Sequence, residues 1–201
     1  SLGGDNSALV WTTDLTAPTL TLMGHENDVN SIQWSPDETK LATASLDGTA
    51  RIWDAQTGTE LLQLARHEGS VTIARWSPDG AYLATAGDDG QICIWDAESG
   101  DNMQCIATAA VPVWNVVWSL DGSRLISGHE DTLLRVWDVA TGQFVEPLAG
   151  HNGAVVSLAR LPEVDTLVSG GGNGLARVWN IAPSTAVASF PSSSGVDGDW
   201  S

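Results

Sequence analysis

The sequence predicts an all-β protein built from one unit that repeats along the chain. Tryptophan recurs every 42 residues without an insertion, at Trp11, Trp53, Trp95, Trp137 and Trp179. Between these tryptophans lie short segments rich in β-branched and aromatic residues, separated by turn signals. No segment shows the period of a long helix, so we expect almost no helix.

Four short strands are predicted in each repeat, and the repeat around Trp53 illustrates them. Pro36 favours a turn after the first strand, because its fixed φ suits the first central position of a turn. Asp47-Gly48 is a hairpin signal between the second and third strands, and Thr57-Gly58 turns the chain into the fourth. The predicted strands cover residues 29–34, 40–45, 49–53 and 60–64.

Two further series keep the same period. One contains His25, His67 and His151, and the other contains Trp34, Trp76 and Trp118 with Arg160 in the fourth place. Together with their flanking dipeptides, these residues resemble the WD-repeat (WD40) family. The resemblance rests on Gly24-His25 with Trp53-Asp54, Arg66-His67 with Trp95-Asp96, Trp137-Asp138, and Gly150-His151 with Trp179-Asn180. It implies a β-propeller, in which four-stranded antiparallel blades pack radially around a channel.

The whole chain, residues 1–201, is expected to belong to this propeller. Full repeats are predicted at about 22–54, 64–96, 106–138 and 148–180, with partial units at 1–21 and 181–201. About five blades are therefore present, whereas the family usually closes with seven or more, or about 290 residues at this period. We expect a part of a seven-bladed or larger propeller. The alternatives are a five-bladed ring, closed by the last strand on the first three, and closure by another chain.

The resemblance also implies a buried, hydrogen-bonded tetrad of His, Ser or Thr, Asp and Trp in each repeat. Such polar groups need partners once they are buried. The matching residues are His25, Thr43, Asp47 and Trp53; His67, Thr85, Asp89 and Trp95; Ser127, Asp131 and Trp137; and His151, Ser169, Asn173 and Trp179. A Ser–His–Asp set also fits nucleophilic catalysis, but recurrence in successive repeats favours a packing role over a single active site.

The third repeat breaks the pattern, because Thr108-Ala109 stands where Gly-His is expected. We interpret this change, and Asn173 in the fourth repeat, as relaxed structural positions. Loss of the histidine is expected to cost about 1–3 kcal/mol if a buried partner is left unpaired. His129 is the one histidine outside the periodic series and is expected to be a turn residue next to Glu130.

Cys93 and Cys105 are predicted to lie on consecutive strands of one hairpin, with the turn near Ser99, where they could face each other. Because cysteine often behaves as a small buried hydrophobe, we expect free thiols. The chain has no Cys-x-x-Cys pair and no Cys/His spacing typical of zinc sites, so neither a metal nor a cofactor is expected.

The formal net charge of −17 predicts repulsion from phosphate backbones and anionic membranes. Nucleic acid and membrane are therefore not expected as partners, whereas a protein or peptide, in particular a basic one, is. The alternative is that the acidity serves only solubility. The sequence has no apolar run long enough to span a bilayer and no signal peptide, so we expect a cytoplasmic protein, or a nuclear one in a eukaryote, rather than a secreted one.

In the family, partners most often dock on the top face around the channel mouth. The residues that match this face vary between repeats, which favours use as a surface. They are Asp28, Asn30 and Leu46; Ser70, Thr72 and Asp88; Pro112, Trp114 and Glu130; and Ala154, Val156 and Gly172. The three acidic members of this set would suit a Lys/Arg-rich peptide, or they are ordinary solvated charges.

Trp114 lies off the two tryptophan series and has two interpretations. It is an exposed hot spot for binding, or it fills the space of the missing histidine. Arg51, Arg135 and Arg177 share one strand position, and we expect them to face solvent with their apolar stems on the blade.

The predicted function is a non-catalytic scaffold that binds a protein or peptide on the top face. The alternatives are a hydrolase-type propeller enzyme, for which His129 and Glu130 are a thin basis, and a regulatory or sensor domain of a larger signalling protein. A carbohydrate-binding role lacks a repeated aromatic pocket. Adaptors of cullin-linked ubiquitin ligases often carry Arg two residues after the Trp-Asp aspartate, where this chain has Gln56, Glu98 and Ala140, which puts that role in doubt.

Overall fold

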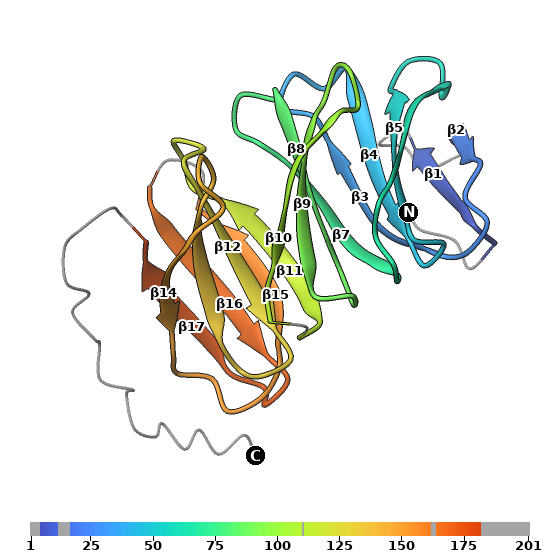
Figure 1. Cartoon of the computed structure of the whole chain (residues 1–201). Helices are drawn as coiled ribbons and strands as arrows, with labels where there is room; N and C mark the ends of the chain where they lie inside the picture. The colour runs from blue at the N-terminus through green and yellow to red at the C-terminus, as the bar shows by residue number, and fades with distance from the viewer. Residues whose placement is uncertain (1–4, 12–16, 110, 162–163, 182–201) are drawn as a thin grey trace, which may run out of the picture.

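A computed structural model describes residues 5–11, 17–109, 111–161 and 164–181, and all regular structure in this part of the chain is β (Figure 1). The strands form five separate antiparallel sheets that stand side by side along the molecule. The expectation of an all-β fold with almost no helix is therefore confirmed. The described residues include no helix that could cross a membrane.

Three of the sheets are complete four-stranded blades. The first blade contains β3 (Val29–Trp34), β4 (Lys40–Ser45), β5 (Thr49–Asp54) and β6 (Glu60–Ala65). The second contains β7 (Val71–Trp76), β8 (Tyr82–Gly87), β9 (Gln91–Asp96) and β10 (Asn102–Ala107). The third contains β11 (Val113–Trp118), β12 (Arg124–His129), β13 (Leu134–Asp138) and β14 (Phe144–Leu148). The predicted first and second strands have the observed bounds, and the third and fourth each extend one residue further.

Two sheets are described in part. The strands β1 (Ser7–Trp11) and β2 (Pro18–Met23) precede the first blade. The fourth blade contains β15 (Val155–Arg160), β16 (Thr166–Gly171) and β17 (Ala176–Asn180). Almost all of the predicted partial unit at 181–201 lies outside the described residues, so the three predicted modes of ring closure stay predictions.

The blades pack through their sheet faces, with one hydrophobic cluster between each neighbouring pair. The inner strands β3, β7, β11 and β15 lie next to one another. Trp76 and Trp118 end two of these strands, and their indole nitrogens donate to the carbonyls of Gln33 and Arg75 in the preceding blade, at 3.3 and 3.0 Å. These two tryptophans therefore tie the second blade to the first and the third to the second, since a buried indole needs an acceptor.

The expectation of free cysteines is wrong. Cys93 of β9 and Cys105 of β10 are register partners with Cα atoms 4.1 Å apart, and they form a disulfide. The sequence placed both residues on one hairpin, but their pairing depends on the register of the two strands, which a bulge near Asn102 shifts.

Without reductant, the purified, denatured chain is expected to take up no iodoacetamide, because both of its cysteines are in the disulfide. Prior reduction should add two labels by mass spectrometry. Because the disulfide closes a short loop, Cys105→Ser is expected to lower the free energy of unfolding by about 3 kcal/mol. Labelling of the unreduced protein would show that the cysteines are free.

Candidate functional site

In the first repeat, the predicted tetrad is joined by hydrogen bonds. The indole of Trp53 donates to the Thr43 hydroxyl at 2.9 Å, and that hydroxyl lies 2.7 Å from Nε2 of His25. Because the hydroxyl accepts from the indole, it donates to Nε2, which assigns the imidazole proton to Nδ1. Nδ1 lies 2.8 Å from Asp47, so this series of hydrogen bonds ends on a carboxylate. We call the series from the tryptophan indole through the hydroxyl to the imidazole the relay.

The carboxylate of Asp47 is held ionised by its neighbours. Burial raises its pKa, but hydrogen bonds from Thr49, the Glu26 backbone amide and His25 outweigh that effect and lower the pKa to about 2. Burial lowers the pKa of His25, against the opposing influence of Asp47. At neutral pH the tetrad therefore contains a neutral imidazole and a charged aspartate.

The second and fourth repeats contain the same relay with one difference. In the second, His67 lies 2.8 Å from the Thr85 hydroxyl and 3.0 Å from Asp89. In the fourth, His151 lies 2.7 Å from the Ser169 hydroxyl, but its Nδ1 has no hydrogen-bond partner. Asn173 replaces the aspartate there, and an amide does not provide the charged acceptor that the first two repeats have.

The third repeat also contains an imidazole, and it comes from His129. This side chain is fully buried at the end of β12, and its Nε2 lies 2.7 Å from the Ser127 hydroxyl, which accepts from the indole of Trp137 at 2.7 Å. The interpretation of His129 as a turn residue is therefore wrong, as is the expectation that this repeat lacks the histidine. Asp131 does not bind the imidazole and instead forms an ion pair with Arg135 at 2.6 Å.

The space around the imidazole explains why His129 can take this role. The matching residues in the second and fourth blades are Gly87 and Gly171, and a Cβ on them would lie 2.9 and 2.5 Å from Nδ1 of the resident histidine. In the third repeat the loop residue is Ala109, so that space is open to a side chain from the strand. The sequence does contain a signal for this role, because His129 lies in the one repeat that has no histidine at the periodic position.

The residues predicted for the top face are brought together in every described repeat. The backbone amides of Leu46, Asp88, Glu130 and Gly172 donate to the carbonyls of Asp28, Ser70, Pro112 and Ala154, at 2.8–3.3 Å. These bonds join the start of each inner strand to the turn before the tetrad aspartate. Leu46, Asp88 and Glu130 are exposed, and Asp28 and Pro112 are half-buried.

A β-bulge lies at the second residue of each inner strand and sets the direction of its side chain. The bulge residues are Asn30, Thr72, Trp114 and Val156. A bulge inserts one residue without a partner in the neighbouring strand and re-aims its side chain. The sequence found these positions by register, and the bulge is the physical reason that they differ from the rest of the strand.

The four bulge residues divide into two pairs. Asn30 donates to the carbonyl of Val71 at 3.0 Å, and the Thr72 hydroxyl lies 2.6 Å from the carbonyl of Val113, so both bridge to the next blade. Trp114 and Val156 are 37% and 48% exposed. Trp114 therefore does not fill the space of the missing histidine, which His129 occupies, and the interpretation as an exposed side chain remains.

The three arginines at one strand position are less exposed than expected. Arg51 is only 8% exposed and forms an ion pair with Glu60 of the outer strand at 2.5 Å, so the expectation that it faces solvent is wrong. Arg135 and Arg177 are half-buried, and Nε of Arg177 is buried without a partner. The carboxylates of Glu60 and Asp131 compensate two of these charges within the blade.

Comparison with known families agrees with this architecture. The family model described as WD domain, G-beta repeat matches residues 16–54, 58–96, 103–138 and 142–180, which is more than half of the chain. The chain belongs to the WD40 family. WD40 repeats generally mediate protein–protein interactions, and WD40 domains are typically non-enzymatic scaffolds. A comparison with curated proteins found no match. In the part of this WD40 chain that the structure describes, no three His, Cys, Asp or Glu side chains gather as a metal site would require.

His129→Gly is expected to lower the free energy of unfolding at pH 7 by about 2–4 kcal/mol, because it leaves a cavity and an unpaired Ser127 hydroxyl. Burial and the nearby Arg135 lower the pKa of His129 to about 4. Below about pH 6.5, His129 therefore binds a proton in the unfolded chain but not in the folded chain. The free energy of unfolding of the original protein falls by up to about 1.4 kcal/mol per pH unit between pH 6.5 and pH 4. Urea unfolding should show that the difference in free energy of unfolding between the original protein and His129→Gly is about 2 kcal/mol smaller at pH 5 than at pH 7.

Ser45→Gly is the matched control, because Ser45 has the same position in the first blade and does not titrate in this range. Its smaller effect should not depend on pH. A gap for His129→Gly that stays constant between pH 7 and pH 5 would contradict the assignment of a buried neutral imidazole.

Proposed function

We propose that this WD40 chain is a non-catalytic scaffold that binds a protein or peptide on the face that carries Trp114. The exposure of Trp114 on the β11 bulge is the observation that carries the proposal. Tryptophan side chains contribute large apolar area at interfaces and dominate measured binding energies. Val156 occupies the same position in the neighbouring inner strand, so two exposed apolar side chains lie at corresponding places.

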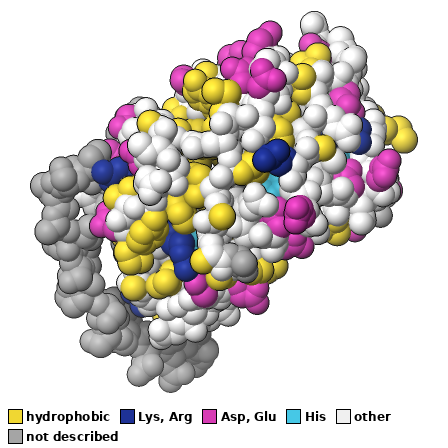
Figure 2. Space-filling model, in the orientation of Figure 1, with side chains coloured by type: hydrophobic (Ala, Val, Ile, Leu, Met, Phe, Trp, Pro, Cys, Tyr) yellow, Lys and Arg dark blue, Asp and Glu magenta, His cyan; other side chains and the backbone are white. Residues whose placement is uncertain are grey.

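A basic partner is the chemistry that this face favours. Asp88 and Glu130 are exposed close to the start of the inner strands, and the net charge is −17. On the side of the molecule drawn in Figure 2, acidic side chains outnumber basic ones, in line with the composition of 25 Asp and Glu against 8 Lys and Arg. Complementary charge speeds the encounter and suppresses acidic competitors, while the apolar side chains supply affinity.

The hydrolase-type alternative gains no support from the site. Its candidate histidine, His129, is fully buried and bonded to Ser127 in a hydrogen-bond arrangement that recurs between repeats. A general base must reach the proton that it abstracts. We therefore propose a binding role without catalysis.

Trp114→Ala is expected to weaken binding about thirtyfold, the loss of one hot spot, while the fold persists. Peptides selected from a random phage library against the immobilised chain would serve as ligands, and fluorescence anisotropy would give the dissociation constants. We expect the selected sequences to be enriched in Lys and Arg.

Trp34→Ala is the matched control, because Trp34 is also exposed, at 46%, but lies at the other end of an inner strand. It should leave the affinity unchanged. If peptides bind Trp114→Ala as tightly as the original chain, with circular dichroism showing an intact fold, the proposed surface is wrong.

A further inference from the structure

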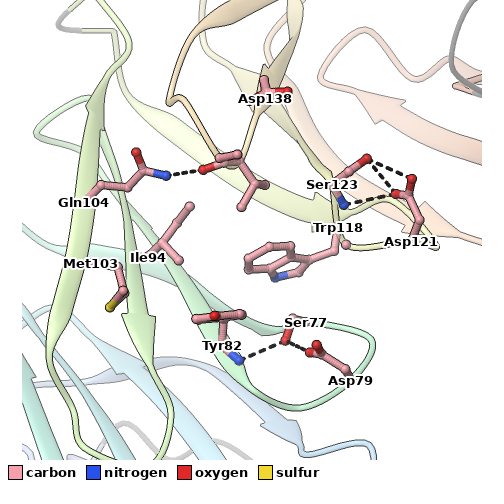
Figure 3. A pocket seen from close by; sticks show the side chains of 13 residues that line it. Ser77, Asp79, Tyr82, Ile94, Met103, Gln104, Trp118, Asp121, Ser123 and Asp138 are labelled. Atoms are coloured by element: carbon pink, nitrogen blue, oxygen red, sulfur yellow. Dashed lines mark hydrogen bonds between the residues drawn. The ribbon is translucent and has the colours of Figure 1, made fainter.

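A groove of about 560 Å³ lies between the second and third blades, at the end of β11 opposite to Trp114. Figure 3 shows Trp118 in the middle of this groove, with Ile94 and Met103 of the second blade on one side. The Gln104 side chain crosses the junction and donates to the backbone carbonyl of Val139 in the third blade. We call this space the second-junction groove.

The wall of the second-junction groove is apolar and accessible. Met103 is 58% exposed and Tyr82 is 36% exposed, although both are large hydrophobic side chains. The disulfide between Cys93 and Cys105 joins the two strands that carry Ile94 and Met103, which fixes this wall. A wall of this kind suits the aliphatic stem of a long side chain and an aromatic contact with its head.

Carboxylates surround the groove, and their hydrogen bonds keep them charged. Asp79 accepts from the Ser77 hydroxyl and the Ala81 amide, and these bonds lower its pKa. Both bonds fall on Oδ1, so Oδ2 takes no part in them. Asp121 and Asp138 have pKa values lowered in the same way, by hydroxyl and amide donors of their own turns. Figure 3 shows the three aspartates around Trp118.

The junction between the first and second blades contains a lysine at the matching position. Tyr82 corresponds, 42 residues earlier, to Lys40, whose ammonium crosses from the first blade to Glu98 of the second at 2.8 Å. Lys40 also lines the cavity of about 270 Å³ at that junction. The backbone amides of Ser99 and Glu98 lower the pKa of Asp96, and Lys40 adds a smaller effect in the same direction. At the first junction, the chain therefore supplies its own cation, which pairs with Glu98.

At the second junction that cation is missing, and so is its acceptor, because Ala140 corresponds to Glu98. The turn aspartates remain, since Asp79 and Asp121 line this groove as Asp37 and Asp79 line the first cavity. Asp138 corresponds to Asp96 and is the register partner of Arg124 in β12. Hydrogen bonds from Thr141 lower its pKa most, and the charge of Arg124 adds to them. Within the described residues, no ion pair reaches Asp79 or Asp121. The place that Lys40 fills in one junction is thus an accessible groove with uncompensated negative charge in the next.

We propose that the second-junction groove binds a lysine or arginine side chain of a partner polypeptide, flanked by an apolar residue. The cation lies next to the ring of Tyr82, which occupies the strand position of Lys40, and is held by the carboxylates of Asp79 and Asp121 in place of the missing Glu98 counterpart. The apolar neighbour contacts Met103 and Ile94. This surface is separate from the face that carries Trp114, so the two can fail independently.

The tripeptide acetyl-Leu-Arg-Leu-amide is the probe, titrated into the isotope-labelled chain by NMR. We expect shifts of the Trp118 indole proton and the Gly122 amide, since both residues line the groove. The citrulline analogue has the same shape without the charge, and it should bind about tenfold more weakly, as should the original probe to the double variant Asp79→Asn/Asp121→Asn. Asp37→Asn changes the matching turn of the first blade and should have no effect.

Tyr82→Lys gives the groove the residue of the first junction and is expected to abolish the shifts. Leu61→Lys is the control of equal charge, because Leu61 is an exposed residue that corresponds to Met103 in the first blade. In the reverse variant, Lys40→Tyr, the first junction should open and the indole of Trp76 should shift as well.

Equal binding of the arginine and citrulline peptides would overturn the proposal, as would unchanged binding to a folded Tyr82→Lys variant. Shifts confined to Trp114 would place the peptide on the top face, which overturns the groove site and leaves the proposed function standing. The absence of any shift with the original chain at millimolar peptide would also overturn it.

Discussion

Each described repeat depends on one buried hydroxyl between an indole and an imidazole. Thr43, Thr85, Ser127 and Ser169 each accept from the tryptophan of their own repeat and contact a histidine nitrogen. Without the hydroxyl, two buried polar groups would lose their partner together, at a cost of about 1–3 kcal/mol each. In the three repeats whose histidine precedes the inner strand, these hydrogen bonds fix the second and third strands relative to that loop, and so they set the position from which the inner strand begins.

The strict period made most of the fold predictable. Strand bounds, turns and three of the four histidine relays followed from residues that recur at one spacing. The exceptions are the features that depend on three-dimensional neighbours. His129 reaches the Ser127 hydroxyl from two residues further along the same strand, Cys93 meets Cys105 only in one register, and Arg51 is buried because Glu60 compensates its charge. A pattern along the chain does not contain this information, because each case is decided by which side chain fills a particular space.

The candidate binding surfaces were predictable to different degrees. Register identified Trp114, but it did not show that Asn30 and Thr72, at the same position, bridge to the next blade. The second-junction groove was not predicted. Its signal is the change from Lys40 to Tyr82 at matching positions, which gains meaning only when both residues are seen to lie between blades. In both surfaces, a residue that bonds to the next blade in one repeat is replaced in another repeat by a residue without that bond. Trp114 replaces Thr72 in this way, and Tyr82 replaces Lys40.

The exchange of Ala109 and His129 bears on how repeats diverge. A repeat that lacks the periodic histidine has kept the contact of indole, hydroxyl and imidazole, although not the carboxylate, because the imidazole comes from a different point on the backbone. The loop released from that duty carries Ala109 at a positive φ of 66°, a conformation not seen at the three periodic histidines. Such an exchange gives a duplicated sequence a route by which one loop can change shape while its blade stays intact, and in this chain the freed loop leads directly into the strand that exposes Trp114.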